Sequence, residues 1–204
     1  MLGGREMIPF PDKKYQIIYA DPPWSYARKV GQGIADKQYD TMPDQDIYDL
    51  PVSDLAEKDC ALICWVTFPK IVEGITAIQS WGFEIKTLFA SWIKTNKSEN
   101  LDQLHFTPRQ LSTFFGIGCY TKSNCEVCLL ATRGNMAKYV KRNDISSVVL
   151  APIGKHSAKP KEVKKMITDL FGELPRIELF ARQETDGWDV WGNEVNLPHP
   201  GGKG

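Results

Sequence analysis

The sequence lacks several features that would assign it to a class at once. It has no run of about 18 apolar residues, the length that a membrane-spanning helix needs. Residues 1–11 contain no apolar segment of signal-peptide length. No charge sign is in excess, because 25 Lys and Arg balance 25 Asp and Glu. A general electrostatic attraction to nucleic acid is therefore not indicated, whereas local basic contacts stay open.

Signals for metals, disulfides and dinucleotides are also missing. The chain has five cysteines, and the one C-x-x-C pair, Cys125 and Cys128, has no second pair at metal-binding spacing. It lies in a strand-like run, where side chains three residues apart point to opposite faces. The three histidines form no cluster in the sequence, and no Gly-x-Gly-x-x-Gly loop occurs. We expect a reduced, intracellular protein that binds no metal and uses no nicotinamide or flavin.

The chain does contain short apolar runs that alternate with helical patterns. We expect an α/β domain over residues 1–197 with a mostly parallel sheet, a disordered tail at 198–204, and mobile loops at 25–39 and 96–110. The stretch 116–134 is typical of a hairpin, which predicts an antiparallel strand. The expected strands span residues 15–20, 60–66, 86–93, 125–131, 147–151 and 177–181, and the expected helices span 70–81 and 161–171.

The most informative residues are Asp21-Pro22-Pro23-Trp24, directly after the first expected strand. Loops at the carboxyl ends of parallel strands form the ligand crevice of α/β folds. Asp21 and the Pro22 carbonyl can accept the two hydrogens of an aromatic amine, and Trp24 can stack on its ring. This pattern predicts a site for a flat base that carries an amino group. The alternative is an ordinary strand-ending turn with Trp24 in the core.

This motif resembles that of the MT-A family of adenine-N6 methyltransferases, which has Asp-Pro-Pro-Trp after a strand. The resemblance covers residues 15–195 and is greatest to the small bacterial and phage branch, through residues 38–42, 50–52, 65–67, 81–87 and 126–134. It implies a Rossmann-like methyltransferase fold in permuted order, with the catalytic motif before the cofactor strand. It also implies S-adenosylmethionine as cofactor, the N6 amine of adenine as target, and Asp21, Pro22, Pro23 and Trp24 as the catalytic residues.

The second half of the chain resembles the cofactor-binding side of the same family. Lys159, in His-Ser-Ala-Lys-Pro, matches the lysine that holds the methionine carboxylate, and a Gly-Asn-Glu segment matches the ribose-binding residues. The chain departs from the messenger-RNA branch after Arg182, where Gln183 and Glu184 replace a His-Asn pair. The resemblance implies cofactor contacts from Asp21, Lys159, Phe180, Arg182, Asn193 and Glu194.

The expected partner is nucleic acid, and DNA is favoured over RNA because of the resemblance to the small bacterial and phage branch. That branch implies a cytoplasmic, bacterial or phage-encoded protein, alone or as a homo- or hetero-oligomer. RNA methylation and a catalytically silent nucleic-acid-binding subunit are the alternatives, although the intact motif disfavours the second. We expect base or strand contacts from Trp24, Tyr26, Lys94 and Arg133, and further phosphate contacts from Lys97, Arg109, Lys138, Lys141 and Arg142.

Overall fold

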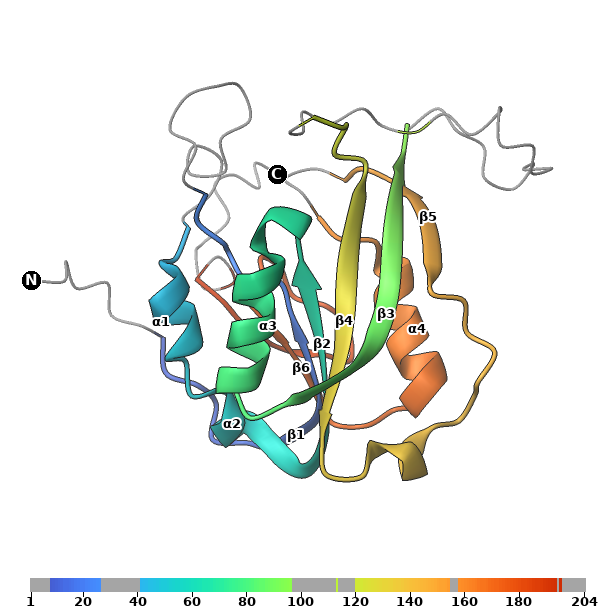
Figure 1. Ribbon diagram of the computed structural model, residues 1–204. Helices are drawn as coiled ribbons and strands as arrows, with labels where there is room; N and C mark the ends of the chain where they lie inside the picture. Colours follow the sequence, from blue (N-terminus) through green and yellow to red (C-terminus); the bar gives the residue numbers. More distant parts are fainter. Residues whose placement is uncertain are drawn as a thin grey trace, which may run out of the picture.

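A computed structural model describes residues 8–26, 41–96, 113, 120–154, 158–193 and 195. In this part of the chain a seven-stranded sheet has the order β5-β3-β4-β2-β1-β6-β7 (Figure 1). The strands are β1 Tyr15–Ala20, β2 Ala56–Val66, β3 Glu84–Thr95, β4 Cys125–Arg133, β5 Val148–Pro152, β6 Arg176–Leu179 and β7 Asp189–Trp191. The helices are α1 Asp44–Tyr48, α2 Val52–Leu55, α3 Ile71–Ser80 and α4 Lys161–Phe171, with 3-10 turns η2 Phe68–Lys70 and η4 Met136–Tyr139.

The strand directions confirm a mostly parallel sheet with an antiparallel strand. β4 is antiparallel to both of its neighbours, β2 and β3, and the other neighbouring pairs are parallel. Ala20 lies between Cys64 and Leu179, so β1, β2 and β6 end together. Because β4 runs the other way, it begins where these strands end, with Val127 opposite Val66. We call this side of the sheet the carboxyl edge.

Helices cover both faces of the sheet, which explains why its central strands are apolar throughout. Along β1, Ile18 and Ala20 pack with α1, α2 and α3, whereas Ile17 and Tyr19 pack on the face covered by α4. Figure 1 shows α3 and α4 on opposite sides of the sheet. In α4 the buried residues recur every four positions, so a single stripe of this helix faces the core. The sheet is thereby held rigidly, with its carboxyl edge left as the place for a site.

The observed elements agree with most of the expected ones. Helix α3 occupies 71–80 and ends before Gly82, whose φ of +81° suits a residue without a side chain. The first arm of the expected hairpin, most of both loops and the tail at 198–204 lie outside the described residues, and the domain limits stay a prediction. β7, α1 and α2 were not expected. No helix in the described ranges has the length and apolar character needed to cross a membrane.

Candidate functional site

The Asp-Pro-Pro-Trp segment leaves β1 at the carboxyl edge, as the sequence predicted, and its backbone is fixed by hydrogen bonds. The Trp24 N–H donates to the Pro22 carbonyl at 2.9 Å, and the Met42 N–H donates to the Pro23 carbonyl at 2.9 Å. Both proline carbonyls therefore already accept one backbone hydrogen bond. Each carbonyl oxygen has a second lone pair, so Pro22 retains the capacity for one more hydrogen bond.

Four charged side chains meet beside this segment, and we call them the charge cluster. Lys159 Nζ lies 2.8 Å from Asp21 Oδ2 and 3.3 Å from Glu126 Oε2, and Lys94 Nζ lies 2.5 Å from Glu126 Oε1. The exposed fraction of the side chain is 8% for Glu126 and 11% for Lys159. Two positive and two negative charges balance, which is the condition under which buried charges are tolerated.

The surroundings keep both buried members of this cluster charged. Burial alone would lower the pKa of Lys159, but Asp21 and Glu126 outweigh it and raise that pKa above its ordinary value. Burial would raise the pKa of Glu126, yet Lys159 and Lys94 hold that pKa below its ordinary value. The buried Cys64 and Cys128 nearby have raised pKa values, chiefly through burial, so their thiols stay protonated and are poor nucleophiles.

A small cavity of about 40 Å³ connects the motif to this cluster and to the end of β6. Thr67, at the end of β2, joins it through a hydrogen bond of 2.6 Å between its hydroxyl and that of Tyr26. The structure thus brings together residues from five separate segments of the chain. The lining residues are Asp21, Pro22, Pro23, Trp24, Tyr26, Thr67, Glu126, Lys159 and Arg182.

Trp24 is mostly a core residue. Its exposed fraction is 3%, and it packs in the cluster beneath α1 and α3. The Trp24 Nε1 atom is buried and has no hydrogen-bond partner among the described residues. The indole of Trp24 thus lies in the core, as the alternative interpretation of the motif expected. Tyr26 is the more exposed aromatic side chain of the cavity.

Two turns come together beside the cavity, at the ends of β6 and β7. The Ala181 N–H donates to the Trp191 carbonyl at 3.0 Å, and Phe180 adopts a φ of +61° that directs the chain back across the edge. A Cβ at Gly192 would lie 2.2 Å from the Ala181 carbonyl oxygen, so only glycine permits this approach. Asn193 is exposed just after the contact, whereas Glu194 lies outside the described residues.

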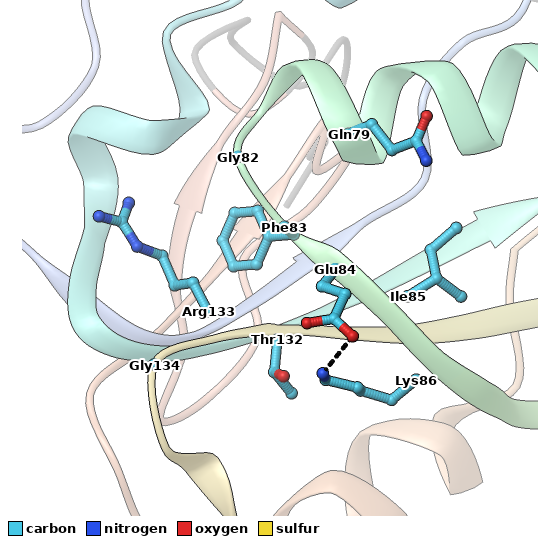
Figure 2. A pocket seen from close by; sticks show the side chains of 9 residues that line it. All are labelled: Gln79, Gly82, Phe83, Glu84, Ile85, Lys86, Thr132, Arg133 and Gly134. Carbon is cyan, nitrogen blue, oxygen red and sulfur yellow. Dashed lines mark ion pairs between the residues drawn. The ribbon is translucent and has the colours of Figure 1, made fainter.

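The structure does not bring Arg133 to this site. Arg133 ends β4 opposite Cys60, near the amino end of β2, and it donates to the Ser53 carbonyl at 3.1 Å. It belongs to a second depression of about 530 Å³ at the far edge of the sheet, shown in Figure 2 with the Glu84–Lys86 ion pair. Because this depression lies at the edge opposite the motif, Arg133 is not a proposed contact for the base or strand at the candidate site. Lys94 does reach the site, but as the partner of Glu126.

Sequence reasoning missed Glu126 and Thr67 as site residues. Glu126 was noted only as the start of a segment that resembles the family. A carboxylate in the apolar run Cys125–Arg133 is unusual for a buried strand, and that mismatch was the available signal. Thr67 carries no such signal, because its place depends on where β2 ends.

Comparisons with known proteins match most of the chain to one family. The family model described as MT-A70 matches residues 15–194. The Type II methyltransferase M.MunI of Mycoplasma sp is 32% identical over 220 residues, covering 96% of this chain and 87% of that protein. The N(6)-adenosine-methyltransferase catalytic subunit METTL3 of Homo sapiens is 27% identical over 188 residues, covering 91% of this chain and 29% of that protein.

A plant relative likewise matches most of this chain with only a small part of its own length. The N(6)-adenosine-methyltransferase MT-A70-like protein of Arabidopsis thaliana is 27% identical over 184 residues, covering 89% of this chain but 24% of its own length. The chain therefore spans about a quarter of these eukaryotic relatives and most of the Mycoplasma one. Since the family model matches residues 15–194, which include every site residue described above, the chain belongs to the MT-A70 family.

Proposed function

We propose that the chain transfers a methyl group from S-adenosylmethionine to the N6 amine of adenine in DNA. The observation that carries this proposal is the buried charge cluster next to Asp-Pro-Pro-Trp at the carboxyl edge. A carboxylate that faces both a fixed lysine and a cavity suits an enzyme that must orient an amine. Membership of the MT-A70 family supports the reaction class.

The residues at the site fit the proposed cofactor. The amino-acid end of S-adenosylmethionine carries an ammonium and a carboxylate, and the site offers Asp21 and Lys159, 2.8 Å apart, as their opposite charges. The paired turns at Phe180–Arg182 and Gly192–Asn193 are the proposed contacts for the nucleoside. When bound, the cofactor supplies a sulfonium methyl that is already strongly electrophilic.

The chain's own contribution to the reaction is positioning. The amine of adenine is a weak nucleophile, because its lone pair is delocalised into the ring. Asp21 and the remaining lone pair of the Pro22 carbonyl can accept its hydrogens and direct the nitrogen. Glu126 and Lys94 are not among the proposed contacts of the amine. Glu126 pairs with both lysines, so we assign Glu126 and Lys94 to positioning Lys159. Tyr26, which is partly exposed at the cavity, is the proposed stacking partner in place of Trp24.

The proposed substrate is an adenine turned out of its strand. The cavity of about 40 Å³ is far smaller than a small-molecule site of roughly 300 Å³ or more, so its lining must separate for a base to enter. A base in a duplex must also leave the stack, which costs free energy that single-stranded DNA does not require. We therefore expect single-stranded or mismatched DNA to be methylated faster than a perfect duplex.

DNA is preferred over RNA because the chain matches nearly the whole length of the Type II methyltransferase, but only a quarter of the proteins named for adenosine N6 methylation. The same match supports an intracellular protein of a bacterium or phage. A catalytically silent subunit is disfavoured, since Asp21 and Lys159 are both present and in contact.

The test is mass spectrometry of nucleosides after incubation with S-adenosylmethionine and one sequence as single-stranded DNA, duplex DNA or RNA. We expect N6-methyldeoxyadenosine with the wild type and none with Asp21→Asn, whose fold should be unchanged. Methylation of RNA alone would overturn the choice of DNA. Absence of methylation in every nucleic acid, or full activity of Asp21→Asn, would overturn the proposed chemistry.

A further inference from the structure

An exposed aromatic side chain lies next to the candidate site and has no role in the reaction described above. Phe68 follows Thr67, which lines the cavity, and its exposed fraction is 79%. Val72 lies one helical turn further, is 69% exposed, and shares this face at the start of α3. Single exposed apolar residues are ordinary on protein surfaces. Two on one face, beginning directly after a residue that lines the cavity, indicate a specific partner.

The segment that carries Phe68 is fixed on both sides. Before it, the Thr67 hydroxyl is bonded to Tyr26. After it, Lys70 is buried and forms ion pairs with Asp44 at 2.7 Å and Glu73 at 3.4 Å. Pro69 further restricts the backbone between them. A ring carried on a fixed backbone loses less conformational entropy when a flat partner packs on it than one on a flexible loop does, which suits a stacking platform.

The charges near Phe68 favour a base over a phosphate. One lysine and two carboxylates give Lys70, Asp44 and Glu73 a net charge of one negative unit, which would repel the phosphate backbone. An aromatic ring binds the face of any base without a charge contact. When an adenine enters the cavity, the nucleotides next to it in the same strand must lie close to the cavity lining, and Phe68 directly follows the lining residue Thr67.

We propose that Phe68 stacks on the base directly adjacent to the target adenine and holds the strand while that adenine is in the site. This inference rests on the proposed function and adds a positioning residue to it. Val72 extends the apolar surface under the same base. The interaction should depend on the presence of that base more than on its identity, because every base has a stacking face.

The test uses a single-stranded DNA oligomer with one adenine that the wild type methylates. We expect Phe68→Ala to raise the KM for this DNA about 5- to 150-fold, whereas Phe68→Tyr stays close to wild type. The KM for S-adenosylmethionine and the thermal midpoint should not change, since the side chain is exposed. Val148→Ala, at another exposed apolar position on the edge strand β5, is the control and should leave every value unchanged.

Oligomers with an abasic nucleotide on one side of the adenine identify the partner. Removing the correct neighbouring base should raise the KM of the wild type as much as Phe68→Ala does, and should have no further effect in that variant. A wild-type KM for Phe68→Ala, or losses that add in the variant, would overturn the stacking role while the methyltransferase assignment stands. A wild type that methylates no nucleic acid would overturn both.

Discussion

The substitution Glu126→Gln is the sharpest test of the charge cluster. It keeps the shape of the side chain and one carbonyl oxygen, but removes a negative charge that accepts hydrogen bonds from Lys94 and lies 3.3 Å from Lys159. The cluster then changes from balanced to one excess positive charge, in a place where the side chain of Glu126 is 8% exposed. Unlike a surface ion pair, this charge is little screened by solvent.

Removing one partner of a buried ion pair lowers the free energy of unfolding by about 3–5 kcal/mol. Because Gln retains a carbonyl oxygen, we expect a loss at the lower end for this variant, about 3 kcal/mol. For a domain of this size, each kcal/mol lowers the thermal midpoint by roughly 2–4 °C, which predicts a drop of about 6–12 °C. We also expect kcat to fall roughly 10- to 100-fold, because Lys159 would lose the charged partner that holds it in position.

Thermal unfolding and steady-state kinetics of Glu126→Gln and Glu178→Gln together provide the assay. Glu178 is the control, since its side chain is 17% exposed and pairs with Lys164 at 2.5 Å, between β6 and α4, outside the charge cluster. Its variant should lose stability while kcat is kept. An unchanged midpoint and kcat in Glu126→Gln would refute the assigned role, as would an equal loss of kcat in both variants.

Three further predictions concern the same site. Lys159→Met should weaken S-adenosylmethionine binding about 10- to 100-fold in a calorimetric titration, because a charge-assisted hydrogen bond is lost, and unaltered binding would misplace the cofactor. Gly192→Ala should lower the unfolding free energy by roughly 1–3 kcal/mol and weaken cofactor binding, since its Cβ would lie 2.2 Å from the Ala181 oxygen, and a wild-type melting curve would contradict that contact. The pKa of Glu126 lies below its ordinary 4.5, so its stabilising contribution is present above about pH 5 and is lost as pH falls through the lowered pKa. The melting midpoints of wild type and Glu126→Gln should therefore converge only in strong acid, and convergence near pH 6 would show that the pKa is not lowered.

The sequence predicted the layers of the fold because periodicity reports which faces are buried. β1 and α4 lie over residues 15–20 and 161–171 as expected, since both are apolar on the faces that pack. β2 begins earlier than expected, at Ala56 instead of Cys60, because pairing with Tyr15 extends the strand through two exposed charged residues. Backbone hydrogen bonds fix that start, and side-chain patterns do not record them.

The short elements were missed for a related reason. β7 has three residues, and α1 and α2 have five and four, too few to show a period. The hairpin pattern predicted an antiparallel strand but not which of its two arms runs against the sheet, so the position of Arg133 was misjudged. That strand is antiparallel, so residues that follow it lie at the edge opposite the motif. Direction within a sheet is a property of tertiary pairing.

The charge cluster supports the proposed cofactor independently of family membership. A balanced set of four charges can exchange partners with a molecule whose interacting end carries one positive and one negative group, and no charge is then left unpaired. A phosphate would bring only negative charge toward the site. Repulsion from Asp21 and Glu126 would offset its attraction to Lys159. The amino-acid end of S-adenosylmethionine meets the condition, because its ammonium can replace Lys159 beside Asp21 while its carboxylate takes the lysine. Glu126 then keeps Lys159 charged and in place throughout the exchange, which is why we assign it a positioning role and expect its charge to matter more than its size.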